Sequence, residues 1–305
     1  MNEIENNEKV TKKTEKKQNK IKHLVMSGGG LAGFSFYGSL KELHNKEVWK
    51  LEDIETMYGT SVGSILSVIL CLNYEWNVLD DYLIKRPWQN IFKFTMYTIV
   101  ESFKKRGFFS IDIFKEFFVP LFKGKDISID ITFQEFYDLN HIDIHMFSTE
   151  LNTYKLIDFS HKTHPNSKLI ETVYYSCSLP IIFSPILKDE LCYCDGGLIS
   201  NYPLKYSLLN GADKSEILGL KSLIYNTDNV KINTETSIFD YIFYILNKIL
   251  EKKLLLNDNI DIPYEISIES PQLCIYTCYK ILSSQEERIK LIEYGKECCS
   301  NIVLS

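Results

Sequence analysis

Two short apolar segments, each followed by a glycine-containing turn and a helical segment, constrain the fold more than any other feature. Residues Ile21–Ser27 predict a buried strand that runs into the glycines of "SGGGLAG", and a helix is expected from Leu31 to about Lys46. Residues Glu55–Tyr58 predict a second strand, which stops at "GTSVGS" before an apolar helix over Ile65–Leu72. Strands that alternate with helices in this way are typical of a parallel α/β sheet.

The middle of the chain interrupts this alternation. Residues 74–125 are helical in pattern and dense in aromatic side chains, so we expect helices laid over the sheet as a cap. Ile142–Thr149 and Tyr154–Phe159 predict a pair of strands, and Ser167–Tyr175 predicts a helix. The following "SCSLPIIFSPI" is expected to be a loop over an edge of the sheet, because two prolines interrupt it.

The last third of the chain predicts further strands and helices. Strands are expected at Leu191–Cys194, Ile217–Leu220 and near Tyr264–Ile268, and helices at Ile238–Leu256 and from Ser283 to about Cys299. No internal repeat or linker forces a division of the chain. We expect a charged, disordered tail over residues 1–20, a core over 21–210, and an α/β extension over 211–305 packed on the same domain.

Composition argues against several classes of protein. The 305 residues are 45% hydrophobic, which is enough for a well-filled core. A net charge of −6 argues against a nucleic-acid binder, which usually has a basic face. None of the eight cysteines forms paired C-x-x-C clusters, so we expect free thiols in a reducing compartment and no structural zinc.

The N-terminal residues 1–20 carry six Lys and four Glu and few apolar side chains. They lack the apolar core of a secretory signal, and no run of the chain approaches the roughly twenty apolar residues that span a bilayer. We therefore expect a cytoplasmic protein that is soluble or peripheral to a membrane. A weak electrostatic attraction of this tail to anionic lipid is the alternative to a merely solvated tail.

The first glycine turn has the spacing of a dinucleotide-binding loop. Gly28, Gly30 and Gly33 form G-x-G-x-x-G, which alone is weak evidence. A dinucleotide site also needs an acidic residue at the end of the second strand. The acidic candidates, Glu52, Asp53 and Glu55, come before that strand or at its start.

The second turn instead has the form of a nucleophile elbow, the sharp strand-to-helix turn that exposes a catalytic serine. Gly59, Thr60, Ser61, Val62 and Gly63 spell G-x-S-x-G between a predicted strand and a predicted helix, which is the context this motif requires. The glycines remove side chains that would clash in the tight turn. The sequence therefore predicts that Ser61 is a nucleophile.

A serine acyl-transfer enzyme must stabilise the oxyanion of a tetrahedral intermediate. Consecutive glycines before a helix allow several backbone N–H groups to converge on one point, as they do around phosphate. Losing one such donor costs about 2.7–4 kcal/mol of transition-state stabilisation. The segment "SGGGLAG" is thus an oxyanion-hole candidate.

The base that would activate Ser61 is less obvious. No histidine follows His164, so in the usual hydrolase order of serine, acid and histidine both the acid and the histidine would have to lie in the middle of the chain. We expect the six histidines at the surface or at helix ends instead. Asp195 in "CYCDGGLISNYP" follows a short apolar strand and precedes Gly196 and Gly197, which permit a sharp turn. A desolvated carboxylate beside a serine can act as the base directly, although Asp-Gly by itself is a common turn.

At this point the chain resembles the patatin-like phospholipases over about residues 21–210. The resemblance is carried by the glycine loop, G-x-S-x-G and D-G-G in this order, together with "GFFSIDIFKEFF", "TFQEFYDL", "SLPIIFSP" and "DGGLISNYPL". It implies a three-layer α/β/α fold around a mostly parallel sheet and a Ser61–Asp195 dyad. It also implies an oxyanion hole built by the backbone of Gly28, Gly29, Gly30 and Leu31, without a metal or other cofactor.

One departure from the family concerns position 32. Many members have Arg or Lys where this sequence has Ala32. Some lipid hydrolases of the family also lack this basic residue, so the departure bears on head-group preference or rate and not on whether the chain is active. The resemblance implies hydrolysis of phospholipid acyl esters through an acyl-enzyme, of the phospholipase A or lysophospholipase type, with a neutral glycerolipid as the next substrate. A lipid-binding protein with weak catalysis and a Rossmann-type oxidoreductase are the rival functions.

A lipid substrate arrives from a membrane or lipid-droplet surface, so we expect an apolar mouth at the site. The sequence leaves the oligomeric state open. Packing in the protein core would account equally well for the apolar side chains that are candidates for this mouth. The candidates are Phe92, Phe94, Met96, Tyr97, Phe108, Phe109 and the face of Ile238–Leu250.

Overall fold

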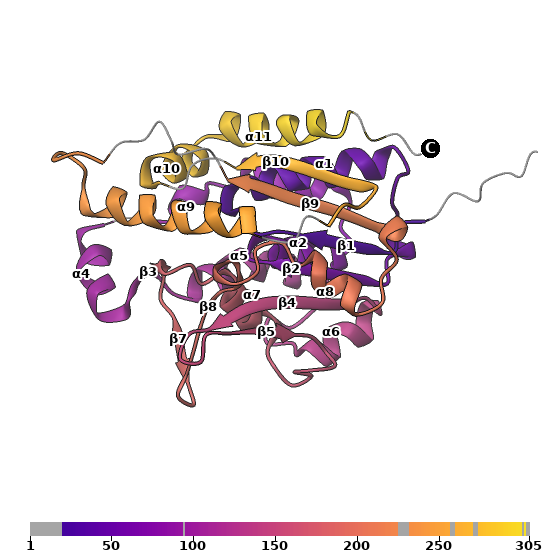
Figure 1. Ribbon diagram of the computed structural model, residues 1–305, viewed down its shortest axis with the longest axis horizontal. Helices are drawn as coiled ribbons and strands as arrows, with labels where there is room; N and C mark the ends of the chain where they lie inside the picture. Colours follow the sequence, from indigo (N-terminus) through magenta and orange to yellow (C-terminus); the bar gives the residue numbers. More distant parts are fainter. Residues whose placement is uncertain are drawn as a thin grey trace, which may run out of the picture.

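The computed structural model describes residues 20–93, 95–224, 232–256, 260–270, 274–300 and 302. Its centre is a sheet in the order β10-β9-β1-β2-β4-β8-β7, with β5 paired to β4 (Figure 1). The expected tail falls almost entirely outside the described residues. The strands are β1 (His23–Met26), β2 (Thr56–Thr60), β4 (Asp143–Glu150), β5 (Lys155–Phe159), β7 (Ile186–Lys188), β8 (Leu191–Asp195), β9 (Ile217–Ile224) and β10 (Tyr264–Ser270).

The strands at the centre of this sheet are parallel, as the alternation in the sequence predicts. β1 pairs in parallel with both β2 and β9, and β2 pairs in parallel with β4. Every residue of β1 and of β4 is buried. Such buried parallel strands are covered on both faces, which accounts for the apolar run Leu24–Met26 in β1, whereas β4 also buries polar and charged side chains.

Helices cover the two faces of the sheet unequally and form the outer layers of an α/β/α arrangement. The larger core lies under α1 (Gly33–Asn45), α2 (Val62–Cys71) and α7 (Leu169–Cys177). The smaller core, which includes Tyr58 and Phe147, lies on the opposite face with residues of α8 (Leu204–Leu209). The predicted fold class is confirmed.

Helix α1 also packs closely against α11 (Gln285–Cys298), although the two are far apart in the sequence. A Cβ on Gly38 of α1 would clash with the backbone carbonyl of Ile292, and a Cβ on Gly295 of α11 would clash with that of Ser35. The hydroxyl of Ser39 donates a 2.7 Å hydrogen bond to the carbonyl of Gly295. The helices therefore meet backbone to backbone.

The aromatic segment over 74–125 is mostly helical, as expected. It contains α3 (Trp76–Asp80), the single turns η3 (Asp81–Lys85) and η4 (Trp88–Asn90), α4 (Met96–Lys105) and α5 (Asp112–Lys123). The expectation of helices alone is wrong at one place. Gly107–Phe109 forms strand β3, which pairs in parallel with β6 (Ile181–Phe183) outside the main sheet.

The expected loop at "SCSLPIIFSPI" is also wrong, because β6 and the first residue of β7 lie within it. Pro180 precedes β6, and Pro185 lies between β6 and β7. Neither proline occupies a strand position, so neither removes a hydrogen bond from a ladder. The prolines thus divide this segment into short strands without preventing pairing.

The C-terminal residues complete the main sheet rather than form a separate one. β9 lies between β1 and β10, and both pairings are parallel. α9 (Ile238–Leu256) has the predicted bounds, whereas α10 (Ile275–Ser283) and α6 (Phe133–Asn140) were not predicted. Among the described residues, none of the helices is both long enough and apolar enough to cross a membrane. The domain boundaries at 20 and 210 stay a prediction.

Candidate active site

The glycine loop and the serine turn meet at the edge of the sheet where β1 and β2 end. β1 and β2 are parallel neighbours, and Met26 pairs in register with Gly59. The loops that leave these strands therefore emerge side by side. A Cβ built on Gly28 would lie 3.2 Å from Cβ of Ser61, so any larger residue at position 28 would press on the serine.

Ser61 itself has an unusual backbone conformation. Its φ of 54° and ψ of −120° lie outside the regions that L-residues prefer, and it caps the N-terminus of α2. A strained backbone of this kind persists only where its surroundings hold it, and it is frequent at functional sites. The conformation is that of the predicted elbow.

Close backbone packing explains the glycines around this serine. A Cβ on Gly59 would lie 2.6 Å from the backbone of Gly63, and one on Gly63 would clash with the carbonyl of Met26. A Cβ on Gly33 would likewise clash with the side chain of Val62. Thr60 donates a 3.1 Å hydrogen bond to the carbonyl of Ser200 and so ties the elbow to the segment after Asp195.

The amide of Ser61 is held by a side chain rather than by the backbone. It donates a 2.9 Å hydrogen bond to Oγ of Ser176 on α7. Ser176 is fully buried, donates to the carbonyl of Phe147 at 2.7 Å, and lies 2.8 Å from Oγ of Ser64. Two elements thus hold the serine turn in place: α7 through Ser176 and strand β4 through Phe147.

Asp195 ends β8 and lies beside the serine. The hydroxyl of Ser61 is close enough to affect the pKa of Asp195, whose Oδ1 accepts a 2.7 Å hydrogen bond from the amide of Gly197. Burial raises the pKa of Asp195 to about 6, while the Ser61 hydroxyl and the Gly197 amide act to lower it. Asp195 is only 6% exposed, so its carboxyl group is a desolvated base candidate beside a hydroxyl.

The backbone of Asp195 is anchored as firmly as its side chain. It lies opposite Ser148 in the antiparallel pairing of β4 with β8. Its amide donates to the carbonyl of Ser178 at 3.0 Å, and its carbonyl accepts from the hydroxyl of Thr149 at 3.0 Å. A Cβ on Gly196 would clash with the carbonyl of Phe147, so only glycine lets this turn lie against β4.

The glycine loop offers fewer free amides than the sequence predicts. The amide of Gly28 donates a 3.0 Å hydrogen bond to the carbonyl of Asn201 and is therefore already used. None of the described residues accepts a hydrogen bond from the amides of Gly29, Gly30 or Leu31, which begin the short helix η1 (Gly30–Ala32). Gly30 needs its positive φ of 53°, which favours glycine.

Asn201, Ser176 and Cys177 belong to this site and were missed as individual residues. Asn201 is 8% exposed, and its amide group donates to the carbonyl of Gly28 at 3.2 Å. Burial raises the pKa of the Cys177 thiol, and the neighbouring hydroxyl of Ser61 acts to lower it. Asn201 lies inside "DGGLISNYPL", which carries the family resemblance, and Ser176 and Cys177 directly precede "SLPIIFSP", which also carries it. These positions are the signal that could have revealed the three residues.

A cavity of about 290 Å³ opens at these residues. Ser61, Asp195, Asn201 and the glycine loop contribute to its lining, and the remaining wall is mostly apolar. Such a wall suits an apolar ligand with one polar reacting group. Its apolar residues include Leu66, Ile69, Leu83, Trp88, Phe92, Phe109, Ile113, Phe114, Phe117, Leu179, Ile182, Phe183, Phe243 and Leu282.

The expected aromatic mouth is only partly exposed. Phe108 and Phe109 are buried, and Phe92 lines the cavity, whereas Tyr97 is 71% exposed. The side chains of Phe94 and Met96 lie outside the described residues. In the described part of the chain, no group of three His, Cys, Asp or Glu side chains is arranged to hold a metal ion.

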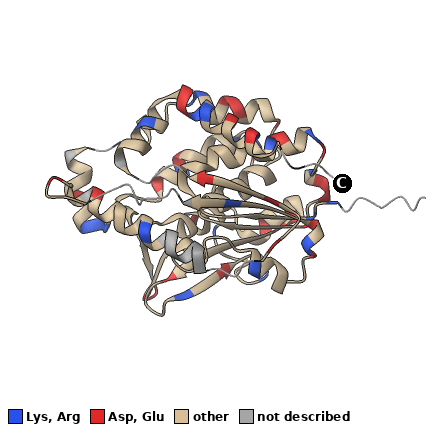
Figure 2. Cartoon of the chain, turned by 45° about the horizontal axis from the view of Figure 1, so that its top comes forward, with Lys and Arg blue, Asp and Glu red and all other residues tan. Residues whose placement is uncertain are grey.

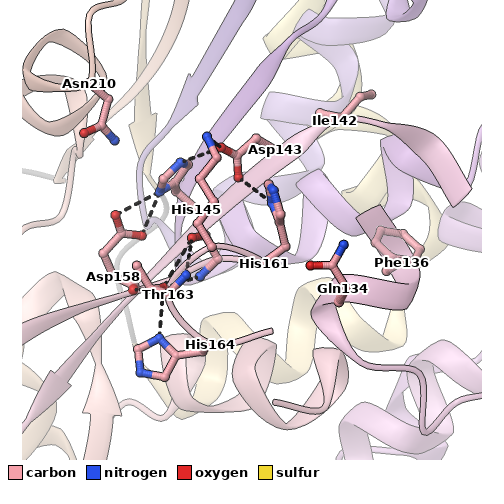
Figure 3. A network of polar contacts seen from close by, with 12 residues as sticks. Gln134, Phe136, Ile142, Asp143, His145, Asp158, His161, Thr163, His164 and Asn210 are labelled. Atoms are coloured by element: carbon pink, nitrogen blue, oxygen red, sulfur yellow. Dashed lines mark hydrogen bonds and ion pairs between the residues drawn. The ribbon is translucent and has the colours of Figure 1, made fainter. Parts of the chain in front are cut away.

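The expectation that the histidines lie at the surface or at helix ends is wrong for His23, His145 and His161, which are buried. Figure 3 shows His145 and His161 in a network with Asp143 and Asp158. Nδ1 of His145 lies 2.8 Å from Asp158, and its Nε2 lies 3.3 Å from Asp143. Asp143 pairs in register with Thr56 at the start of β2, so the network lies at the opposite end of that strand from Ser61.

Comparison with known proteins places this geometry in a family. The model of the patatin-like phospholipases matches residues 24–208, which is more than half of the chain and includes the glycine loop, Ser61 and Asp195. This chain belongs to the patatin-like phospholipase family. The resemblance inferred from the motifs is confirmed, and lipid-ester hydrolysis is the class of activity that the family supports.

Viral proteins are among the relatives of this patatin-like chain. It is 26% identical over 300 residues to an uncharacterized protein of Acanthamoeba polyphaga mimivirus, covering 91% of this chain and 97% of the relative. It is 27% identical over 213 residues to a probable lipid hydrolase of invertebrate iridescent virus 6, covering 68% of this chain and 71% of the relative.

Two bacterial structures are also similar. VipD from Legionella pneumophila has a TM-score of 0.48 at 16% identity, covering 90% of this patatin-like chain and 67% of its own. ExoU from Pseudomonas aeruginosa, in complex with SpcU, has a TM-score of 0.41 at 13% identity, covering 92% of this chain and 52% of its own.

Proposed function

We propose that this patatin-like protein hydrolyses fatty-acyl esters of lipids through a Ser61 acyl-enzyme, with Asp195 as the general base. The observation that carries the proposal is the contact between the buried Asp195 carboxyl group and the Ser61 hydroxyl in a mostly apolar cavity. A base with a pKa of about 6 is largely ionised at neutral pH, yet basic enough to accept a proton in the transition state.

The proposed reaction has two steps. Ser61 Oγ attacks the ester carbonyl while its proton passes to Asp195, and the protonated Asp195 then gives that proton to the leaving alcohol. Asp195 then takes a proton from the water that attacks the acyl-enzyme, and it returns this proton to Ser61 Oγ as the fatty acid leaves. The metal-independence of this scheme is part of the proposal.

We assign the oxyanion hole to the amides of Gly29, Gly30 and Leu31. These groups point from the first turn of η1, where N–H groups lack partners within the helix. Gly28 has a different part in this proposal. Because its amide is bonded to Asn201, it brings the loop close to Ser61 rather than donating to the substrate.

We place the acyl chain in the apolar cavity and propose a phospholipid as the first substrate, with a neutral glycerolipid next. Ala32 is fully buried, so the loop carries no cation at that position to select a phosphate head group. Selection would then depend on the acyl chain more than on the head group.

The test compares wild type, Ser61→Ala and Asp195→Asn on phospholipid vesicles and on a short soluble ester, with EDTA present. Both variants should lose at least about 10³-fold in kcat, because each removes a member of the proposed dyad. Ser283→Ala and Asp126→Asn, which change the same residue types at exposed positions, serve as matched controls. Undiminished hydrolysis by either dyad variant would refute the mechanism.

A further inference from the structure

Helix α4 exposes a row of large apolar side chains. Tyr97, Val100 and Phe103 are 71%, 58% and 80% exposed, and their spacing of three residues places them on one face of the helix. Apolar area left in water costs about 25 cal/mol per Å², so exposing this row of side chains is unfavourable for the free energy of the isolated protein. Contiguous patches of this kind mark contact surfaces.

Helix α9 exposes a second row while its opposite face lines the cavity. Ile238, Tyr241, Ile245 and Ile249 are 63%, 45%, 38% and 43% exposed and recur every three or four residues. Phe243, on the other side of the helix, is 3% exposed and belongs to the cavity wall. One helix thus separates the proposed acyl site from the outside with apolar groups on both faces.

Helix α10 repeats this arrangement. Tyr276 and Tyr279 are 74% and 59% exposed, whereas Cys278 and Leu282 line the cavity. Figure 1 shows α4, α9 and α10 together at the end of the molecule toward which β9 and β10 point. That end is also where β1 and β2 lead into the glycine loop and Ser61, so the exposed rows surround the catalytic end.

The C-terminal end of α4 carries a local positive charge, in contrast to the whole chain. The chain has a net charge of −6, yet α4 ends in Lys104, Lys105 and Arg106. The two lysine side chains are 78% and 57% exposed, and Glu101 faces both at 3.6–3.8 Å. Figure 2 shows Lys and Arg in blue on this part of the surface. This end of α4 therefore carries three cations and one carboxylate beside the apolar row.

We infer that the outer faces of α4, α9 and α10 dock on the surface of an anionic phospholipid bilayer. An amphipathic helix with Tyr and Phe on one face and cations at its edge is the form that lies in a membrane interface. Docking through the outer faces of α9 and α10 would put the bilayer directly against the two helices that wall the cavity. This inference rests on the proposed function, because it supplies the route by which a lipid ester reaches Ser61.

The test measures flotation of the Ser61→Ala protein with vesicles, so that the lipid stays intact during the measurement. Phosphatidylcholine vesicles are compared with mixed phosphatidylcholine and phosphatidylglycerol vesicles. We expect binding to the mixed vesicles that falls at high salt, because cations near an anionic surface contribute through screened electrostatics.

Three variants in this background separate the contributions. Combined Tyr97→Ser, Val100→Ser and Phe103→Ser should weaken binding to the mixed vesicles at least tenfold. Lys104→Gln with Lys105→Gln should weaken it about fivefold for each lysine. Leu139→Ser with Leu209→Ser removes apolar groups that are 60% and 70% exposed on α6 and α8, and this matched control should bind like its parent.

The outcomes distinguish this inference from the proposed function. Equal flotation of all variants, or none by the parent, would overturn it. A concentration-dependent dimer that the α4 serine variant abolishes would instead assign the surface to a second copy of the chain, and would also overturn it. The same α4 changes made with Ser61 intact should keep hydrolysis of the soluble ester, whereas failure of the proposed function would appear as no Ser61-dependent hydrolysis at all.

Discussion

The amide of Ser61 donates its hydrogen bond to the hydroxyl of Ser176, which lies 115 residues later in the chain on helix α7. The serine that carries the proposed chemistry therefore keeps its strained backbone conformation through a side chain from another element. Ser176 touches no substrate in this arrangement. It is a positioning residue, and its removal should reveal how much of the activity depends on the geometry of the turn.

We predict that Ser176→Ala lowers kcat on a soluble ester by 10- to 100-fold with little change in KM. The variant leaves the partly buried amide of Ser61 without its hydrogen-bond partner, at a cost of up to about 1–3 kcal/mol. Ser67→Ala is the control, because Ser67 is equally buried and bonds only the carbonyl of Gly63 within its own helix. Equal kcat values for the two variants would show that Ser176 has only a structural role.

The raised pKa of Asp195 predicts the pH dependence of activity. The base works only when ionised, so kcat/KM on a soluble ester should be constant above pH 7 and fall about tenfold per unit below pH 6. Circular dichroism at each pH checks that the protein stays folded. A profile that stays level down to pH 4.5 would exclude Asp195 with this pKa as the base.

The His145 network predicts a pH dependence of stability instead. Burial acts to lower the pKa of His145, but its contacts with Asp143 and Asp158 raise it to about 9. Its pKa in the folded state is thus above its ordinary value of 6.5. The stabilisation is fully present below pH 6.5 and is lost as the pH rises through 9; a shift of this size corresponds to about 3 kcal/mol.

We therefore expect the free energy of unfolding in urea to fall between pH 6.5 and 9.5 in wild type and to fall less in His145→Gln. The activity of the folded variant should be unchanged, because the network lies at the opposite end of β2 from Ser61. His141→Gln, at the exposed C-terminal end of α6, is the control. Parallel pH curves for wild type and His145→Gln would contradict this assignment.

The contact between α1 and α11 predicts that Gly38→Ala and Gly295→Ala each destabilise the fold by about 1–3 kcal/mol, the usual cost of overpacking. Each added methyl group would meet a backbone carbonyl of the other helix, which cannot rotate away. Thermal unfolding measures the effect, with Ser283→Ala as a control at an exposed helix end. An unchanged Tm in both glycine variants would show that the helices are not packed this closely.

Local pattern was enough to predict much of this molecule. The strand and helix around each glycine turn, and the bounds of α9, follow from apolar runs and breakers that act over a few residues. The chemistry of Ser61 and Asp195 was inferred for the same reason, because each motif is contiguous. Their proximity depends on register, because β8 runs antiparallel to β4: Asp195 pairs with Ser148, and Thr60, which precedes Ser61, pairs with the neighbouring Phe147.

The features that could not be predicted depend on contacts between residues that lie far apart in the chain. β3 and β6 are three-residue strands that exist only because they pair with each other across more than 70 residues. Asn201 acts on Gly28 through its backbone carbonyl and its side-chain amide, which are contacts between residues 173 positions apart that a local pattern does not specify. His145 was misplaced because histidine is usually exposed, and its burial depends on carboxylates from two strands.

The position of β9 between β1 and β10 has a consequence for biosynthesis. A ribosome releases β1, the glycine loop and the serine turn long before residues 217–224 are made. Until then β1 has an unpaired edge, and the segment from Ser27 onward lacks the hydrogen bond that its amide donates to the carbonyl of Leu220. The nascent chain therefore emerges with the motifs of the proposed site complete in sequence but unassembled in space, and the proposed hydrolytic activity should appear only after the last third has been translated.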